Sequence, residues 1–284
     1  MSRKDLKDIV ASIHQKLLNK SREEGRPFEE LQQYYAMERF LYRLSMSEHR
    51  SKFILKGALS LVAARAPATR PTRDIDLKGE MSNDVDDVVA VIADICGTEV
   101  EPDGMDFHAD TVQGDVIDDD DDYNGVRVVF KGSLGNARVK MQLDIGFGDN
   151  VVPSPRSVKY PVILDHPEFE LLTYPFESTI AEKFQAMVRH GEVNSRMKDF
   201  FDVWYLLRNF DFDDRVLKKA IETTFQTRST EVPEDIHEFF GRLKSPEKER
   251  QWTAFVVRSK LSVSPETFAA AIDTLADQLT HVMR

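Results

Sequence analysis

The chain has 284 residues, of which 41% are hydrophobic and 10% aromatic, enough for one large or two modest globular domains. Its formal charge of −11 argues against a protein that binds polyanions over its whole surface, but it allows a local basic cleft. No apolar run reaches the roughly 18 to 20 residues of a membrane span, and the N-terminus has no signal-peptide segment. We therefore expect a cytoplasmic protein with no membrane partner, in which Cys96, the only cysteine, is buried rather than nucleophilic.

Two amphipathic helices are predicted at the start of the chain, over residues 5–20 and 28–44, because apolar residues recur there at helical spacing. Residues 25–27, Gly-Arg-Pro, separate them. Arg39 and Arg43 lie one turn apart on the second helix. They predict either a solvated or salt-bridged helix face or, less readily, a contact with phosphate or RNA.

A strand, a glycine turn and a helix follow in quick succession. Residues 53–55 predict a short buried strand, residues 56–58 a tight turn, and residues 59–66 a helix that Pro67 ends. Backbone N–H groups at such a turn form a ready site for an anion.

The next strand, over residues 74–77, carries two acids. Residues two apart in a strand point to the same face, so Asp74 and Asp76 are predicted to lie together. Two carboxylates so close either share a proton or bind a hard cation, most commonly Mg²⁺ with a nucleoside triphosphate. A solvated strand end is the plain alternative, and the glycine turn just upstream favours the metal.

A helix over residues 85–95, capped by Ser82 or Asn83, is predicted to cover one face of a sheet. Residues 126–130 and 137–145 predict an antiparallel hairpin. Asp144 points to its polar side, and a third carboxylate there would complete a two-metal site that activates an attacking hydroxyl.

Two other acidic features have plainer interpretations. Asp149 competes with Asp144 for the third position, but it follows two glycines in a predicted turn, where aspartate is common. The acidic stretch at residues 115–122 predicts a solvated loop rather than a metal site.

Helices are predicted over residues 176–190 and 196–209. Lys183 borders the apolar stripe of the first, where it either snorkels to solvent or reaches a triphosphate. On the second, Arg196 and Asp199 lie beside packed aromatic residues. A surface ion pair of Lys183 or Arg196 with Asp199 is the structural alternative to a place in an active cleft.

The remaining pattern is helical, with Pro233 and Pro265 at predicted helix starts. The predicted fold class is therefore α+β. Residues 1–165 would form an α/β domain with N-terminal helices, and residues 166–284 a helical domain that completes the active cleft.

These motifs together resemble the AbiEii/AbiGii toxin family of the nucleotidyltransferase superfamily. The motifs that carry the resemblance, in order, are Phe53-Ile54-Leu55-Lys56-Gly57-Ala58, Arg73-Asp74-Ile75-Asp76-Leu77, Gln142-Leu143-Asp144-Ile145-Gly146-Phe147-Gly148-Asp149, Glu182-Lys183-Phe184-Gln185-Ala186-Met187 and Arg196-Met197-Lys198-Asp199-Phe200-Phe201-Asp202. The resemblance implies a nucleotidyltransferase-like sheet with flanking helices. It also implies a bacterial toxin of phage-defence type, encoded beside a cognate antitoxin, that transfers nucleotides from a nucleoside triphosphate to RNA such as tRNA.

The resemblance also implies roles for particular residues. Asp74 and Asp76, with Asp144, would hold Mg²⁺, and Lys183 and Asp199 would complete the catalytic set. Nucleotide contacts would come from the phosphate-binding turn and from basic residues near the motifs, namely Lys56, Gly57, Arg73 and Arg196.

One departure from the family pattern concerns the glycine turn. Ala58 and Leu59 stand where the family has Gly and Thr or Ser, so a hydroxyl contact is missing, and Ser60 or Thr72 would have to replace it. Two alternative functions stay open at this point. They are a small-molecule nucleotidyltransferase of the antibiotic-modifying type and a catalytically silent module that binds a nucleotide or partner.

Overall fold

The computed structural model describes residues 3–66, 71–117, 125–261 and 263–284. The chain divides into two compact units. Unit 1 consists of residues 1–66, 72–148 and 157–173, and unit 2 of residues 67–71, 149–156 and 174–284. The predicted aspartate run at residues 118–122 and the predicted helix stop at Pro67 lie outside the described residues.

Unit 1 is built on one mixed seven-stranded sheet with the order β3-β4-β5-β2-β1-β7-β6. The strands are β1 (Phe53–Leu55), β2 (Ile75–Gly79), β3 (Met105–Ile117), β4 (Gly125–Leu134), β5 (Ala137–Gly146), β6 (Arg156–Tyr160) and β7 (Phe169–Thr173). The helices of this unit are α1 (Arg3–Glu24), α2 (Phe28–Met46), α3 (Gly57–Ala63) and α4 (Val85–Cys96). This arrangement confirms the predicted α+β class.

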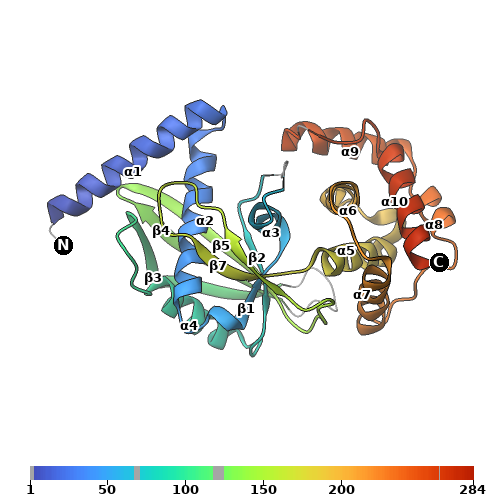
Figure 1. Ribbon diagram of the computed structural model, residues 1–284, viewed down its shortest axis with the longest axis horizontal. Coiled ribbons are helices and arrows are strands. Elements are labelled where there is room, and N and C mark those ends of the chain that lie inside the picture. The colour runs from blue at the N-terminus through green and yellow to red at the C-terminus, as the bar shows by residue number, and fades with distance from the viewer. Residues whose placement is uncertain (1–2, 67–70, 118–124, 262) are drawn as a thin grey trace. The chain divides into compact units, whose positions relative to one another are not determined.

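The hairpin of β4 and β5 has one buried and one open face, as alternation in β5 predicts. Its apolar set is buried: Val139, Met141, Leu143 and Ile145. Helices α2 and α4 pack on this side of the sheet, where Phe40 of α2 contacts the rings of Phe107 and Phe130 (Figure 1). The opposite face of β4 and β5 carries the polar side chains, Asp144 among them.

Strand β3 is the longest strand that the sequence did not predict. It runs through a β-bulge between His108 and Gln113, where its register against β4 shifts. Most of its side chains are exposed or half-buried, so the alternation that identifies a strand is missing. Asp115, predicted to lie in a loop, belongs to β3 and is in register with Arg127 of β4.

The predicted start of α4 at residue 85 is confirmed, but Asp84, rather than Ser82 or Asn83, caps it by accepting hydrogen bonds from two backbone N–H groups. Two predicted helix starts in unit 2 are shifted by two to three residues. Asp235 and Thr267 are the N-caps where Pro233 and Pro265 were predicted to begin helices. In both helices a capping oxygen within reach of free N–H groups decided the start more strongly than the nearby proline did.

Unit 2 is helical. Its helices are α5 (Phe176–His190), α6 (Met197–Asn209), α7 (Asp214–Thr227), α8 (Ile236–Arg242), α9 (Pro246–Ser259) and α10 (Phe268–Met283). Gly191 ends α5 at a positive φ of 50°, as its sequence position predicts. The core of the unit is aromatic, with Phe184 stacked on Phe240 and Phe200 edge-on to Phe268.

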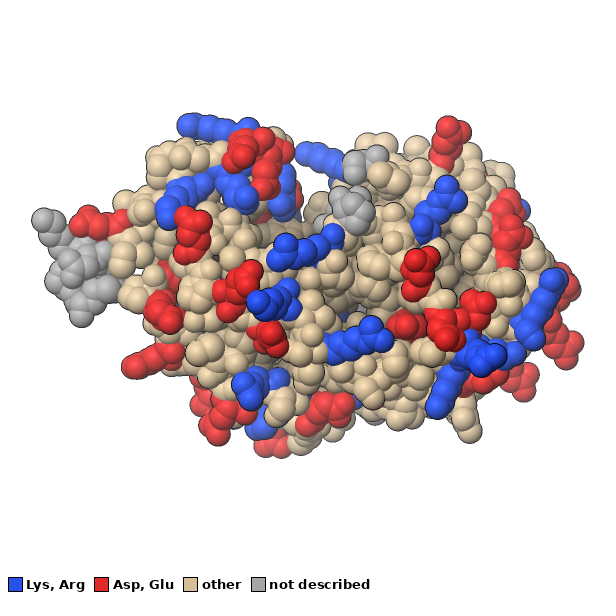
Figure 2. Space-filling model, viewed as in Figure 1, with Lys and Arg blue, Asp and Glu red and all other residues tan. Residues whose placement is uncertain are grey.

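Two general expectations from composition can be compared with the structure. Cys96 is buried, and burial raises the pKa of its thiol to about 12, which confirms an inert apolar role. None of the helices in the described ranges combines the length and apolar character needed to cross a membrane. In the view of Figure 2 acidic and basic side chains are interspersed, so the net negative charge does not form a single acidic surface there.

The arginines of α2 are buried rather than solvated. Arg43 donates to both carboxylate oxygens of Asp103, at 2.7 and 3.1 Å, and Arg39 lies 2.9 Å from Glu38 and over the ring of Tyr42. The salt-bridged alternative is therefore correct for both, but inside the protein. The partner of Arg43 lies 60 positions away, beyond the reach of helix-face reasoning.

Replacing Arg43 with alanine should destabilise unit 1 strongly, because the carboxylate of Asp103 would stay buried without its partner. We expect a loss of about 3–5 kcal/mol in the free energy of unfolding, measured by urea denaturation. The matched control is Lys20→Ala, which breaks the half-buried surface pair of 2.9 Å with Glu24 and should cost under about 1 kcal/mol. Equal effects of the two substitutions would contradict the assignment.

Candidate active site

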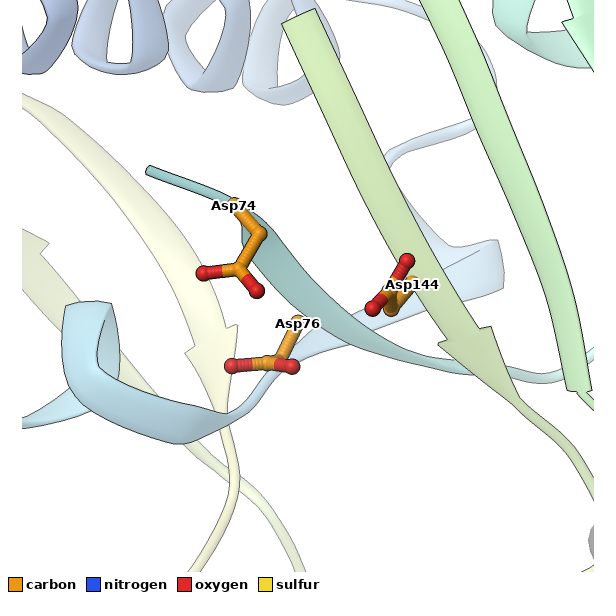
Figure 3. A group of neighbouring side chains, drawn as sticks. All are labelled: Asp74, Asp76 and Asp144. Atoms are coloured by element: carbon orange, nitrogen blue, oxygen red, sulfur yellow. The ribbon is translucent and has the colours of Figure 1, made fainter. Parts of the chain in front are cut away.

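Three carboxylates meet on the open side of the sheet in unit 1. Asp74 immediately precedes β2, Asp76 lies within it, and Asp144 lies in register with Asp76 on the parallel neighbour β5. Figure 3 shows the three side chains on these two adjacent strands. One oxygen from each carboxylate can be chosen so that all three lie within 4.8 Å of one another.

Gly57 allows the carboxylate of Asp76 to lie against the turn between β1 and α3. The backbone N–H of Lys56 donates to the carbonyl of Asp76 at 2.8 Å, which ties the turn to β2. Gly57 has a φ of +64°, and a Cβ built there would lie 1.9 Å from Oδ2 of Asp76. Both the left-handed backbone and the close approach therefore require glycine. The predicted turn is confirmed in place, although Gly57 is already the first residue of α3.

The two candidate replacement hydroxyls make different contacts. Thr72 donates from its hydroxyl to Oδ1 of Asp74, and its backbone N–H donates to the hydroxyl of Tyr34 at 3.1 Å. Ser60 donates to the carbonyl of Gly57 at 2.7 Å, within its own helix. Only Thr72 thus contacts one of the three carboxylates. Arg73 is exposed beside them, and its carbonyl accepts from Gln33 at 3.4 Å.

Asp144 has a partner that the sequence analysis missed. Arg127, opposite it on β4, donates from Nε and Nη2 to the two oxygens of Asp144 at 2.8 and 2.9 Å. Such a bidentate pair fixes the plane of the carboxylate. Pairing residues 126–130 against residues 137–145 in antiparallel register would have revealed this contact.

The donor set fits a small divalent cation. Three carboxylates supply hard oxygen ligands, which Mg²⁺ prefers, and they are half-buried rather than sealed from water, as a metal that keeps part of its hydration shell requires. Because Gly57 has no Cβ, the carboxylate of Asp76 has room to stay beside those of Asp74 and Asp144. No other group of three or more potential ligands occurs among the described residues.

A second charged cluster lies in unit 2. Nζ of Lys183 on α5 bonds Oδ1 of Asp199 and lies 3.0 Å from Asp202, both on α6, while Nε of Arg196 lies 2.7 Å from Oδ2 of Asp199. The side chain of Asp199 is fully buried and that of Lys183 is 17% exposed. The ion pairs of Lys183 and Arg196 with Asp199, which were the structural alternative, are present, although the carboxylate of Asp199 is buried rather than on the surface.

The ionisation of Asp199 follows from these neighbours. Burial alone would raise the pKa of its carboxyl, but the positive charges of Lys183 and Arg196 outweigh burial and hold the pKa at about 2, below the ordinary 3.8. Asp199 is therefore a buried carboxylate that stays charged at neutral pH and holds the ammonium of Lys183 in place.

Asp149, the competitor of Asp144 in the sequence, belongs to unit 2. Its carboxylate accepts two bonds from Arg228, the C-cap residue of α7, at 2.8 and 3.1 Å. Arg228 also lies 3.7 Å from Glu182 and donates to Gln185. Asp149 thus fastens the segment after β5 to the helices of unit 2.

Comparison with known proteins identifies the family. The model of the nucleotidyl transferase AbiEii toxin family, of type IV toxin-antitoxin systems, matches residues 39–274. The chain belongs to the AbiEii toxin family. As a member, it is a nucleotidyltransferase, and the family implies a nucleotide substrate and a cognate antitoxin.

Similar solved structures come from Helicobacter pylori. The crystal structure of JHP933 has a TM-score of 0.54 at 13% identity, with 90% of this chain and 92% of that chain covered, which supports the shared fold. A second structure, described as a putative nucleotidyltransferase, has a TM-score of 0.49 at 11% identity and covers 90% and 95% of the two chains. No curated protein matches this AbiEii member closely enough to add a function.

Replacing Gly57 with alanine should displace the carboxylate of Asp76, because the new Cβ would overlap Oδ2. Gly25→Ala is a matched control, since Gly25 has a φ of +65° and a Cβ added there would meet no neighbouring atom within 4 Å. Both variants should lose about 1–2 kcal/mol of stability from left-handed backbone strain. Only Gly57→Ala should also weaken Mg²⁺ binding, measured by isothermal titration calorimetry, and equal Mg²⁺ affinity of the two would contradict the geometry.

Replacing Lys183 with alanine should destabilise unit 2 by up to about 3–5 kcal/mol at neutral pH, because the buried Asp199 loses one of its two cationic partners. The pKa of Asp199 is depressed in the folded protein, so its contribution is complete above the unfolded value near 3.8 and is lost as the pH falls towards 2. The stability difference from the wild type should therefore narrow in acid. Urea denaturation from neutral pH down to the lowest pH of folding measures it, with the exposed Lys219→Ala as control. A pH-independent difference would contradict the role of this pair.

Proposed function

We propose that the chain transfers a nucleotidyl group from a nucleoside triphosphate to an RNA acceptor, with Mg²⁺ held by Asp74, Asp76 and Asp144. The observation that carries this proposal is the meeting of three carboxylates beside the glycine turn. In such a transfer the acceptor hydroxyl oxygen bonds to the α-phosphorus, pyrophosphate leaves, and the hydroxyl proton is released. Bound Mg²⁺ would neutralise triphosphate charge and favour ionisation of that hydroxyl.

The residues of unit 1 would prepare the nucleotide for this reaction. The backbone N–H of Gly57 would contact the phosphates, and Lys56 and Arg73 would add positive charge. Thr72 supports this proposal because its hydroxyl bonds Asp74 and so orients that carboxylate. Arg127 would orient Asp144 in the same way from β4.

Unit 2 would supply the cation for the triphosphate. Lys183, with 17% of its side chain exposed, can present Nζ to phosphate oxygens while Asp199 and Asp202 fix its position. Arg196, whose side chain is 48% exposed, would add a second contact to the nucleotide. Asp199 is fully buried, so we assign it the positioning of these two cations.

The wider setting of this reaction is also part of the proposal. The protein would act in the bacterial cytoplasm on tRNA or another RNA, as a toxin of phage-defence type opposed by its antitoxin. No specific observation favours a small-molecule acceptor or a silent binding module. Because Leu59 lacks the hydroxyl that the family has at this position, the experiment below distinguishes both functions from transfer to RNA.

Asp76→Asn should abolish Mg²⁺-dependent label transfer from an α-labelled nucleoside triphosphate to total bacterial RNA. Loss of one metal ligand removes several kcal/mol of transition-state stabilisation, so the rate should fall about a hundredfold or more. Asp106→Asn is the matched control, since Asp106 is an exposed aspartate of the same sheet outside the three-carboxylate group. Asp74→Asn should behave as Asp76→Asn does.

Other results of the same assay would contradict the proposal. Wild-type rates in both Asp74→Asn and Asp76→Asn would exclude the metal mechanism. Label on a small molecule instead of RNA would favour the antibiotic-modifying alternative. A wild-type protein that gains thermal stability with nucleotide, but transfers no label with any nucleoside triphosphate, would be a silent binding module.

A further inference from the structure

The open face of β4 and β5 carries an unusual group of positive charges. Lys131 of β4 lies directly opposite Lys140 of β5. Arg138 lies two residues before Lys140 on β5 and points to the same face. All three residues are exposed or half-buried at the surface of the hairpin. We call this group the β4–β5 basic face.

These charges form no salt bridge of their own, although the exposed Asp106 of β3 lies on the same face, opposite Ser133. Lys131, Arg138 and Lys140 form no salt bridge with any residue that the structure describes. Two like charges directly opposite on an antiparallel pair destabilise the sheet. The lysine pair therefore costs the folded protein some stability, which a bound anion would offset.

The β4–β5 basic face leads to the three-carboxylate group. Lys140, Gln142 and Asp144 alternate along β5 and point to the same side, so the positive charges and the candidate metal ligands share one surface. Four residues of strand separate Lys140 from Asp144, a distance of about 13 Å. A polyanion lying along the strand could thus place one end at the carboxylates.

The other side chains of this face indicate how such a ligand is recognised. Val129 and Ser133 on β4 and Gln142 on β5 have no aromatic ring on which a base could stack. A ring that does lie beside the lysine pair is the imidazole of His108 on β3, opposite Lys131, and Ser133 holds it at 3.2 Å. Contacts from lysine and arginine to phosphate position a nucleic acid without reading its sequence. An acidic protein would satisfy the same charges, and the test below includes it as the contrary outcome. RNA is favoured here because the lysines and the candidate metal ligands lie along the same strand, as a bound acceptor strand requires.

We propose that the β4–β5 basic face binds the phosphate backbone of the RNA acceptor and guides its end to Asp144. This inference rests on the proposed transfer to RNA and adds the surface that holds the acceptor. A chain with a net charge of −11 can bind RNA in this way, because the positive charges that contact the phosphates are gathered on one local surface.

The test combines Lys131→Gln and Lys140→Gln and measures binding of a short fluorescein-labelled single-stranded RNA by fluorescence anisotropy at several salt concentrations. Two lost phosphate contacts should lower the slope of log affinity against log salt by about 1.4 and weaken binding at every salt concentration. Lys159→Gln, an exposed lysine of β6 in the same sheet, should leave affinity and slope unchanged. Unchanged RNA affinity and slope in the double variant would overturn the proposal and leave the face to an acidic protein.

Two further readouts separate an RNA-binding role from a structural one. The melting temperature of the double variant should be equal to or higher than that of the wild type, because the substitutions relieve the lysine repulsion. In the transfer assay KM for RNA should rise while kcat at saturating RNA stays unchanged. A lowered melting temperature with unchanged KM would also overturn the proposal. Absence of label transfer in the wild type would refute the proposed function, whereas the anisotropy result would still decide RNA binding.

Discussion

The contact of Asp76 with the turn at Gly57 is the constraint on which the site depends. The N–H of Lys56 bonds the carbonyl of Asp76, and the missing Cβ of Gly57 leaves room for its carboxylate. These two contacts fix the start of α3 against β2, and the parallel register of β2 with β5 then places Asp144 beside Asp76. Gly57 thus determines both the conformation of the turn and the position of the Asp76 carboxylate beside it.

The elements that the sequence predicted are those with a local signal. Alternation along β5 identified its buried face and hence the direction of Asp144, and the helical period together with Gly191 gave α5 its bounds. Strand β3 escaped prediction because its bulge and its exposed side chains interrupt the alternation. A strand of this kind is specified by its partner β4 more than by its own pattern.

Side-chain partners were harder to predict than side-chain directions. Arg43 and Asp103 are 60 residues apart, so no spacing rule joins them, and the arginine was expected on the surface. Arg127 and Asp144 are only 17 residues apart across a hairpin, and their contact follows once the register is known. Pairing strands residue by residue therefore recovers polar contacts that helical periodicity alone does not give.

The buried cluster around Asp199 and the exposed β4–β5 basic face illustrate opposite uses of electrostatics. In unit 2, Asp199 is sealed from water and its charge is maintained by Lys183 and Arg196, so removing either partner leaves a charge that water cannot solvate. On the β4–β5 basic face, Lys131 and Lys140 repel each other in the open, and water and salt moderate the cost. The buried cluster stabilises the fold only while its side chains keep their positions. The exposed lysines still attract anions, and an exposed surface of this kind can release one anionic ligand and bind another.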